Sequence, residues 1–191
     1  ITIASGVLGS NFIGRSLAQV AKDQKISGAE AVLKLLTATR DQITVFWHDL
    51  EENVLEMMLK HPLSIFATDG SGYGSADSKK GLAPHPRSFG ATAKILGHYV
   101  REKKLLSLEE AVYKMTSKPA EWMGLVDRGF LAKNSFADIA IFDPSKIKDE
   151  SSYTNPYRHP QGISHVLING QLAIRNGQYQ NARSGRVIRK S

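Results

Sequence analysis

Alternation between strand-like and helix-like hydrophobic patterns is the feature of this sequence that most limits its fold. Apolar runs typical of strands cover residues 42–47 and 63–68, and segments with helical spacing of apolar residues follow each of them. Strands that alternate with helices along a chain favour parallel crossover connections. We therefore expect an α/β fold over residues 1–125.

The last part of the chain has a different pattern, because strand-like runs at 136–142, 163–168 and 171–175 follow one another without helices. The dipeptide Asn169-Gly170 separates the last two runs, and both residues tolerate the positive φ angles of a two-residue hairpin. We expect a second, β-rich segment over residues 126–191.

Three helices are expected to begin at Ser27, Asp49 and Ser107, each of which is followed three positions later by Glu. In this arrangement the capping side chain and the Glu satisfy backbone N–H groups at the helix end. A further helix is expected from about Arg87 to Lys103 and a short one near 120–123. Three large residues on the apolar faces of these helices are expected in the core: Met57, Met58 and Trp122.

Composition excludes several classes of protein. The net charge of +7 comes from scattered basic residues without a basic stripe or interleaved aromatics, so we expect no nucleic-acid partner. No apolar run approaches the roughly 18 residues of a membrane span, and we expect no membrane partner. The absence of cysteine excludes disulfides and thiolate chemistry in these residues, which is consistent with a cytoplasmic location. Because the chain begins at Ile1, we expect that further residues precede it.

Asp69 is the first candidate for chemistry, since it follows the apolar run at 63–68 and precedes a long loop rich in Gly, Ser and Lys. Catalytic residues of barrel enzymes lie at strand ends of this kind. The alternative is that Asp69-Gly70 only forms a turn. The loop lacks the Gly-Lys-Ser/Thr ending of a phosphate loop, and its residues Tyr73, Lys79 and Lys80 are candidates for substrate contact.

A metal site made of His48, Asp69 and His85 is a further alternative, but the spacing does not favour it. Paired metal ligands usually recur at short, fixed separations on one strand or helix, and no such pair is present. Structural roles are favoured for His48 and for the remaining histidines, which are His61, His98, His159 and His165.

Several sequence strings, taken in order, are similar to a known family. They are Thr68-Asp69-Gly70, His85-Pro86-Arg87, Gly97 to Arg101, Leu106 to Val112, Lys114 to Ala120, Asp127 to Gly129, Ala137 to Asp143, His165 to Gly170 and Ser184 to Val187. Together they resemble N-acyl-D-amino-acid deacylases of the metal-dependent amidohydrolase superfamily. Each string alone is weak, whereas the ordered set covers almost the whole chain.

The resemblance implies a (β/α)8 TIM barrel with a small β-sandwich domain, and an enzyme that uses zinc to hydrolyse the amide bond of N-acyl-D-amino acids. It implies Asp69 as the catalytic residue that accepts a proton from water and passes it to the leaving amine. Arg87 is implied as the group that binds the α-carboxylate of the substrate, with His85 beside it in the binding site.

The zinc ligands of the family have no counterpart here, because the chain contains neither a His-x-His pair nor a cysteine. An eight-unit barrel also needs about 250 residues. We therefore expect a C-terminal fragment that holds no metal and is inactive alone, and that forms a homodimer or associates with a missing N-terminal half through its unpaired edges.

Two alternatives stay open at this point. The chain is a non-catalytic association module derived from the same superfamily, or part of a related cyclic-amide or enamide hydrolase. Arg87 favours an acyl-amino-acid substrate over a cyclic amide, since a carboxylate on the substrate gives the guanidinium a partner.

Overall fold

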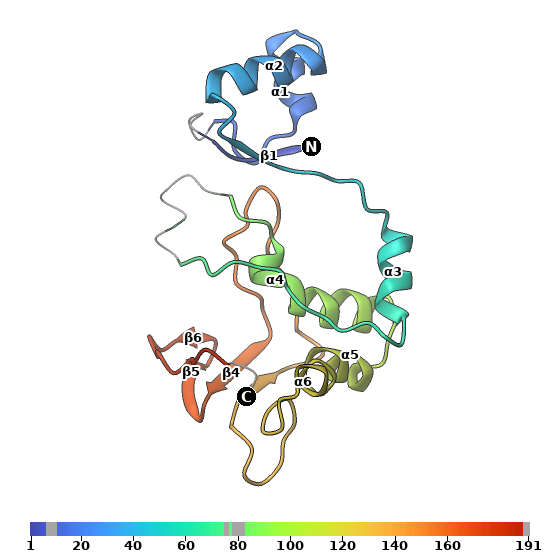
Figure 1. Ribbon diagram of the computed structural model, residues 1–191, viewed down its shortest axis with the longest axis vertical. Helices are drawn as coiled ribbons and strands as arrows, with labels where there is room; N and C mark the ends of the chain where they lie inside the picture. The colour runs from blue at the N-terminus through green and yellow to red at the C-terminus, as the bar shows by residue number, and fades with distance from the viewer. Residues whose placement is uncertain (7–10, 75–76, 78–82, 189–191) are drawn as a thin grey trace. The chain divides into compact units, whose positions relative to one another are not determined.

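The computed structural model describes residues 1–6, 11–74, 77 and 83–188 (Figure 1). The chain divides into two compact units, each assembled from three separate stretches. Unit 1 consists of Ile1–Glu51, Asp69–Gly90 and Ser151–His159, and unit 2 of Glu52–Thr68, Ala91–Glu150 and Pro160–Ser191. The predicted boundary near residue 125 between a partial barrel segment and a β-rich segment stays a prediction.

The described residues of unit 1 form two strands, two whole helices and the first turn of a third, α4 (Arg87–Lys94). Strand β1 (Thr2–Gly6) pairs with β2 (Ile43–Phe46) in an antiparallel ladder, and helices α1 (Leu17–Gln24) and α2 (Gly28–Thr39) lie between them in the sequence. Ser27 caps α2 as predicted, because its hydroxyl accepts the N–H of Glu30 at 3.1 Å. The small core of this unit is formed by Ile3, Val20 and Leu35.

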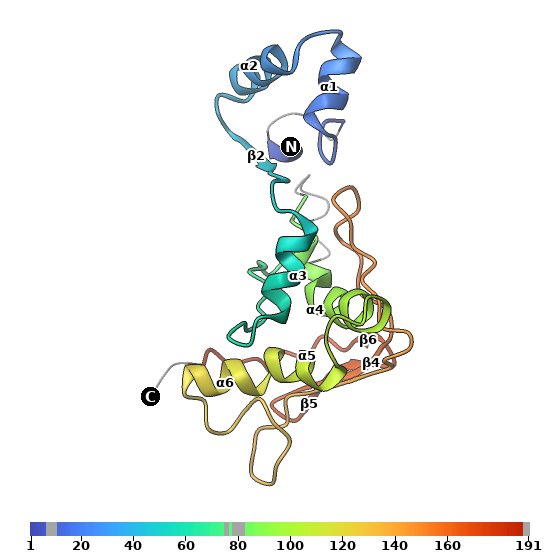
Figure 2. The same cartoon turned by 90° about the vertical axis from the view of Figure 1, so that its right-hand side faces the viewer.

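Five helices of the described residues belong wholly or partly to unit 2. They are α3 (Glu52–Lys60), α4 (Arg87–Lys94), the π-helix η2 (Ile95–Glu102), α5 (Leu108–Met115) and α6 (Ser117–Met123). The helix predicted from Arg87 to Lys103 is therefore present, with its second half wound as a π-helix. Figure 2 shows α6 continuing on from α5 along the chain.

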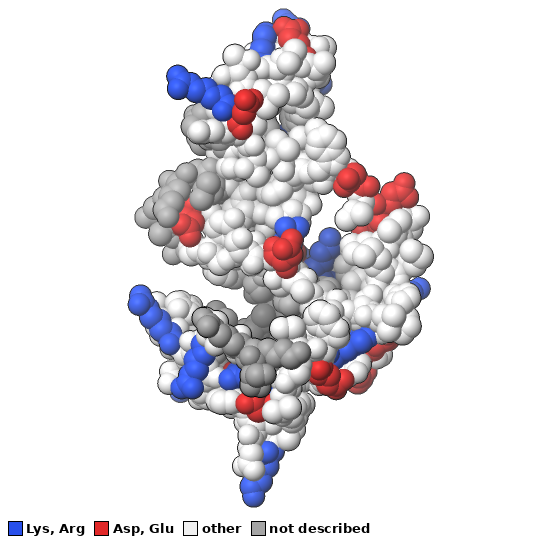
Figure 3. Space-filling model, viewed as in Figure 1, with Lys and Arg blue, Asp and Glu red and all other residues white. Residues whose placement is uncertain are grey.

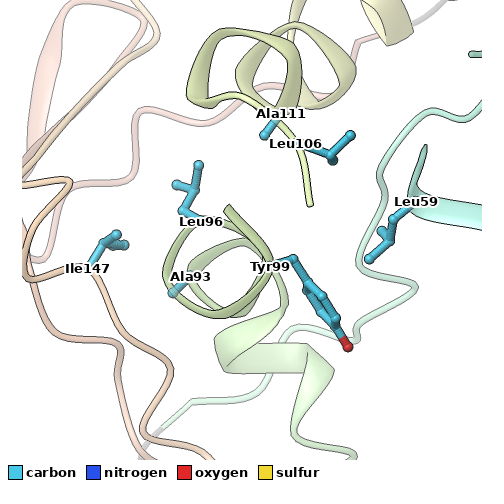
Figure 4. Packing of buried hydrophobic residues seen from close by; sticks show 7 residues of the cluster. All are labelled: Leu59, Ala93, Leu96, Tyr99, Leu106, Ala111 and Ile147. Carbon is cyan, nitrogen blue, oxygen red and sulfur yellow. The ribbon is translucent and has the colours of Figure 1, made fainter. Parts of the chain in front are cut away.

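The core of unit 2 surrounds η2 and α5 (Figure 4). It contains Leu59, Ala93, Leu96, Tyr99, Leu106, Ala111 and Ile147. Gly97 allows the segment at Ile147 to pack against η2, because a Cβ at position 97 would lie 2.5 Å from the carbonyl oxygen of Ile147. The guanidinium of Arg101 donates to the same carbonyl, also at 2.5 Å.

A four-stranded antiparallel sheet completes unit 2. Its strands are β3 (Ile139–Phe142), β4 (Ile163–Ile168), β5 (Gln171–Arg175) and β6 (Gln178–Tyr179), in that spatial order. The hairpin predicted at Asn169-Gly170 is confirmed, since the two residues have φ angles of 50° and 77°.

The strand predicted at 63–68 is wrong, because these residues have no regular structure. A strand needs a neighbouring strand as hydrogen-bond partner for its backbone groups. Here these backbone groups form hydrogen bonds with other parts of the chain. The N–H of Phe66 donates to the carbonyl of Lys114 at 2.9 Å, and the ammonium of Lys118 donates to the carbonyls of Pro62 and Ser64. Parallel crossovers are not observed either, since both sheets in the described part of the chain are antiparallel.

Two smaller predictions also fail. Helix α3 begins at Glu52 rather than beside Asp49, because residues 47–51 have no regular structure. Met57, Met58 and Trp122 are 64%, 55% and 76% exposed instead of buried, since no described segment covers these faces of α3 and α6.

Lys and Arg side chains are separated by uncharged residues over most of the face shown in Figure 3. Of the helices described, none combines the length and the hydropathy that crossing a bilayer requires.

Candidate active site

Asp69 and Arg87, which sequence reasoning selected separately, are bonded to each other. Oδ2 of Asp69 lies 2.6 Å from Nη2 of Arg87, and the backbone carbonyl of Asp69 accepts the Arg87 Nε–H at 3.1 Å. Asp69 has a φ of 45°, a left-handed conformation that Asp adopts more readily than most residues. The guanidinium therefore binds both the side chain and the main chain of Asp69.

The position of Arg87 is set by the beginning of α4. Nδ1 of His85 accepts the backbone N–H of Arg87 at 3.1 Å, and the carbonyl of His85 accepts the N–H of Ser88 at 3.0 Å. The first N–H groups of a helix have no partner within the helix, so this ring supplies one. His85 thus acts as the helix cap that places Arg87, a role that its sequence neighbourhood did not reveal.

The other ring nitrogen of His85 faces the loop at 151–159. Nε2 of His85 lies 3.0 Å from the hydroxyl oxygen of Tyr153. The Tyr153 ring packs at right angles on the rings of His85 and His48, and it also contacts Phe46. Burial raises the pKa of Tyr153, and the nearby charge of Arg87 offsets part of that rise.

Asp69, His85 and Arg87 border an open cavity of about 220 Å3 in unit 1. Its lining is formed by Ala4, Ser5, Thr44, Phe46, Asp69, Ser71, Tyr73, Ala83, Pro84, His85, Arg87 and Ser88. Asp69, His85, Arg87 and Tyr73 are thus brought together as candidates. Lys79 and Lys80 lie outside the described residues.

Sequence reasoning missed Phe46 and Tyr153. Tyr153 is 84 positions from Asp69 in the sequence, and Phe46 lies on a strand that offered only an apolar pattern. The one available signal was the pair of tyrosines in the loop Tyr153-Thr-Asn-Pro-Tyr157, and nothing in their spacing pointed to His85.

The residues around this cavity do not fit a metal site by themselves. Both ring nitrogens of His85 have hydrogen-bond partners, His48 Nε2 lies 2.9 Å from the hydroxyl of Thr2, and the Asp69 carboxylate is paired with Arg87. Across the described ranges, no group of three or more His, Cys, Asp or Glu side chains is arranged to hold a metal ion. The described residues therefore form no metal site, either at this cavity or elsewhere.

Comparisons with known proteins agree with the resemblance seen in the sequence. The model of the Amidohydrolase family matches residues 23–174. The N-acyl-D-glutamate deacylase of Alcaligenes xylosoxydans xylosoxydans is 34% identical over 177 residues, which are 93% of this chain and 34% of that protein.

Two solved structures are similar in fold. A crystal structure of D-aminoacylase superposes with a TM-score of 0.82 at 27% identity, over 97% of this chain and 37% of that one. The N-acyl-D-glutamate deacylase of Bordetella bronchiseptica, solved with zinc and a phosphonate inhibitor, gives a TM-score of 0.76 at 28% identity, over 95% of this chain and 37% of that one. The chain spans about a third of the length of the relatives it matches, and it belongs to the amidohydrolase family.

Proposed function

We propose that this chain is the C-terminal part of a zinc-dependent enzyme that hydrolyses the amide bond of N-acyl-D-amino acids. The deacylases among its relatives support the reaction class, and the paired Asp69 and Arg87 at one cavity support the site. In the intact protein we place these residues in the last part of a (β/α)8 barrel with a small β-sandwich domain. Residues outside this chain would hold the zinc, which would supply a water molecule of lowered pKa.

The contact between Asp69 and Arg87 is the observation that carries the proposal. The two side chains are 85% and 46% exposed, so both are accessible to a ligand in the cavity. Asp69 binds the Nε and Nη2 groups of the guanidinium, and no other described residue binds the Nη1 group of Arg87, so that group can bind a second carboxylate. An α-carboxylate bound there lies beside the carboxylate that transfers the proton.

Each residue then has one task in the reaction. Arg87 binds the substrate carboxylate and orients the scissile amide. Asp69 accepts a proton from the attacking water and donates it to the leaving nitrogen as the amide C–N bond breaks. His85 holds the first turn of α4, so that the guanidinium stays at the cavity.

The test is hydrolysis of a substrate panel by the whole protein with zinc. The panel holds N-acetyl-D-amino acids with acidic and apolar side chains, their L-enantiomers, and cyclic amides. We expect turnover of the D-acyl amino acids alone. Asp69→Ala should lower kcat by about 10²- to 10⁴-fold, and Arg87→Met should raise KM by about 10- to 100-fold, as the loss of a charged hydrogen bond predicts.

A second exposed ion pair of unit 1 provides matched controls. Arg15 pairs with Asp23, and neither residue lines the cavity. Asp23→Ala and Arg15→Met should leave kcat and KM within about two-fold, as expected for surface substitutions. Turnover of cyclic amides in place of the acyl amino acids would point to the related hydrolases, and absence of all turnover would favour the association module.

A further inference from the structure

Tyr153 belongs to a hydrogen-bonded series that ends at the candidate substrate anchor. Its hydroxyl oxygen lies 3.0 Å from Nε2 of His85, and Nδ1 of that ring lies 3.1 Å from the backbone nitrogen of Arg87. The side chain of Arg87 then reaches Asp69. Two stretches that are distant in the sequence, Asp69–Gly90 and Ser151–His159, meet in this series, and both belong to unit 1.

The chemistry of imidazole fixes the direction of these bonds. A backbone N–H is only a donor, so Nδ1 of His85 must accept and therefore carries no proton. In a neutral ring the proton then lies on Nε2, which donates to the hydroxyl oxygen of Tyr153. A tyrosine at this place stabilises the one tautomer of His85 that can cap α4.

The surroundings of Tyr153 hold its hydroxyl where His85 needs it. The ring lies 4.5 Å from the His48 ring and 5.1 Å from the His85 ring, both edge-on, and 5.4 Å from Phe46. Burial raises the pKa of Tyr153, so the hydroxyl stays neutral at physiological pH. The phenol is therefore a fixed, uncharged acceptor for the Nε2 proton.

We infer that Tyr153 is a positioning residue for carboxylate recognition: through the tautomer of His85 it fixes the backbone of Arg87, and with it the guanidinium that binds the substrate carboxylate. This inference rests on the proposed function and deepens it. It predicts that the Tyr153 hydroxyl matters for substrates with a free α-carboxylate and not for their neutral counterparts.

The kinetic test compares Tyr153→Phe with wild type on the best N-acetyl-D-amino acid of the panel and on the α-carboxamide of the same compound. Loss of one hydrogen bond predicts a rise of about 3- to 10-fold in KM for the acid, with kcat within two-fold. The carboxamide should show no change, because it does not use the charge of Arg87. In an Arg87→Met background the same substitution should add nothing for either substrate.

Tyr113→Phe is the matched control. The hydroxyl of this tyrosine of unit 2 also makes a side-chain hydrogen bond, which it donates to Glu121 at 3.3 Å, but it has no place in the series. It should leave both KM values unchanged. An equal loss for acid and carboxamide in Tyr153→Phe would show a merely structural role, and unchanged kinetics on the acid would also overturn the inference.

A spectroscopic measurement separates this inference from the proposed function. In the whole protein labelled with 15N-histidine, with the His85 signals assigned by His85→Gln, long-range 1H–15N spectra should show the proton of His85 on Nε2. In Tyr153→Phe the signals should move toward the other tautomer or a mixture. If the protein hydrolyses no acyl amino acid, the proposed function fails, and an unaltered tautomer in Tyr153→Phe would separately overturn the positioning role.

Discussion

Lys114 offers the sharpest test of how unit 2 is stabilised, because its ammonium group is buried. Its side chain is only 3% exposed. Nζ donates to the carbonyl of Leu59 at 2.7 Å and to that of His61 at 3.1 Å, and it pairs with Glu110 at 3.1 Å. These carbonyls lie at the end of α3, where backbone acceptors lack partners within the helix. The ammonium therefore caps that helix from a distant segment.

The cost of Lys114→Met follows from these contacts. Methionine keeps most of the stem, so little packing is lost, but the carbonyl of Leu59 is left buried without this donor, at a cost of about 1–3 kcal/mol. The carbonyl of His61 is only partly buried, and water replaces part of its bond. The pair with the half-exposed Glu110 contributes less than about 1 kcal/mol. Because the ammonium no longer needs to be desolvated, we expect a net loss of about 2–3 kcal/mol.

Urea unfolding followed by circular dichroism measures this loss as a lower midpoint with an unchanged slope. Lys146→Met is the matched control, because Lys146 is 77% exposed and its pair with Asp143 is 3.4 Å long. That variant should lose less than about 0.5 kcal/mol. A loss below about 1 kcal/mol in Lys114→Met would refute the reasoning, since it would mean that water satisfies the carbonyls of α3 without the ammonium.

Two further predictions concern unit 2. Gly162→Ala and Gly170→Ala both place a side chain at positive φ, but only at Gly162 would the Cβ meet rigid backbone, 2.5 Å from the nitrogen of Ile147. In urea unfolding, Gly162→Ala should therefore lose about 1–3 kcal/mol more of the free energy of unfolding than Gly170→Ala. Equal losses in the two variants would contradict this. A hydrogen bond from His98 lowers the pKa of Glu102, so this carboxylate stabilises the fold above the unfolded-state pKa of about 4.3, and the stabilisation is lost as the pH falls through the lowered pKa. Glu102→Gln should thus lower the unfolding midpoint at pH 6 and leave it equal to that of wild type at pH 2. The same difference from wild type at both pH values would rule out this linkage.

Local signals predicted the elements whose cause is local. Ser27 and Ser107 cap their helices because a hydroxyl reaches an N–H three residues on, at 3.1 Å in both cases. The turn at Asn169-Gly170 forms because both residues adopt positive φ. The conformation of each feature follows from residues no more than three positions apart.

The failures have a common physical origin in distant partners. An apolar run at 63–68 matches a strand, yet strand formation depends on a neighbouring backbone, and Lys118 and Lys114 bind these groups instead. The exposure of Trp122 is likewise decided by what covers α6 and not by its helical position. Strand pairing and side-chain burial thus depend on contacts between distant segments, which a local sequence pattern does not predict.

The same distinction explains the candidate site. Asp69 and Arg87 were selected by residue type and by family resemblance, and the structure adds that they touch. Tyr153 was missed because its importance comes from one contact with His85 across 68 positions of sequence. The residue types thus indicated which side chains are candidates for the reaction. Which residue positions them depends on how the loop at 151–159 packs.

The pair between Asp69 and Arg87 raises the question of whether it blocks the site. An ion pair exposed to this degree contributes about 0–1 kcal/mol, because water solvates both groups almost as well when they separate. A substrate carboxylate that binds the planar guanidinium through two parallel hydrogen bonds gains more than that. The pair is therefore too weak to prevent a substrate carboxylate from binding at the Nη1 side of the guanidinium, beside the Asp69 carboxylate to which we assign the proton transfer.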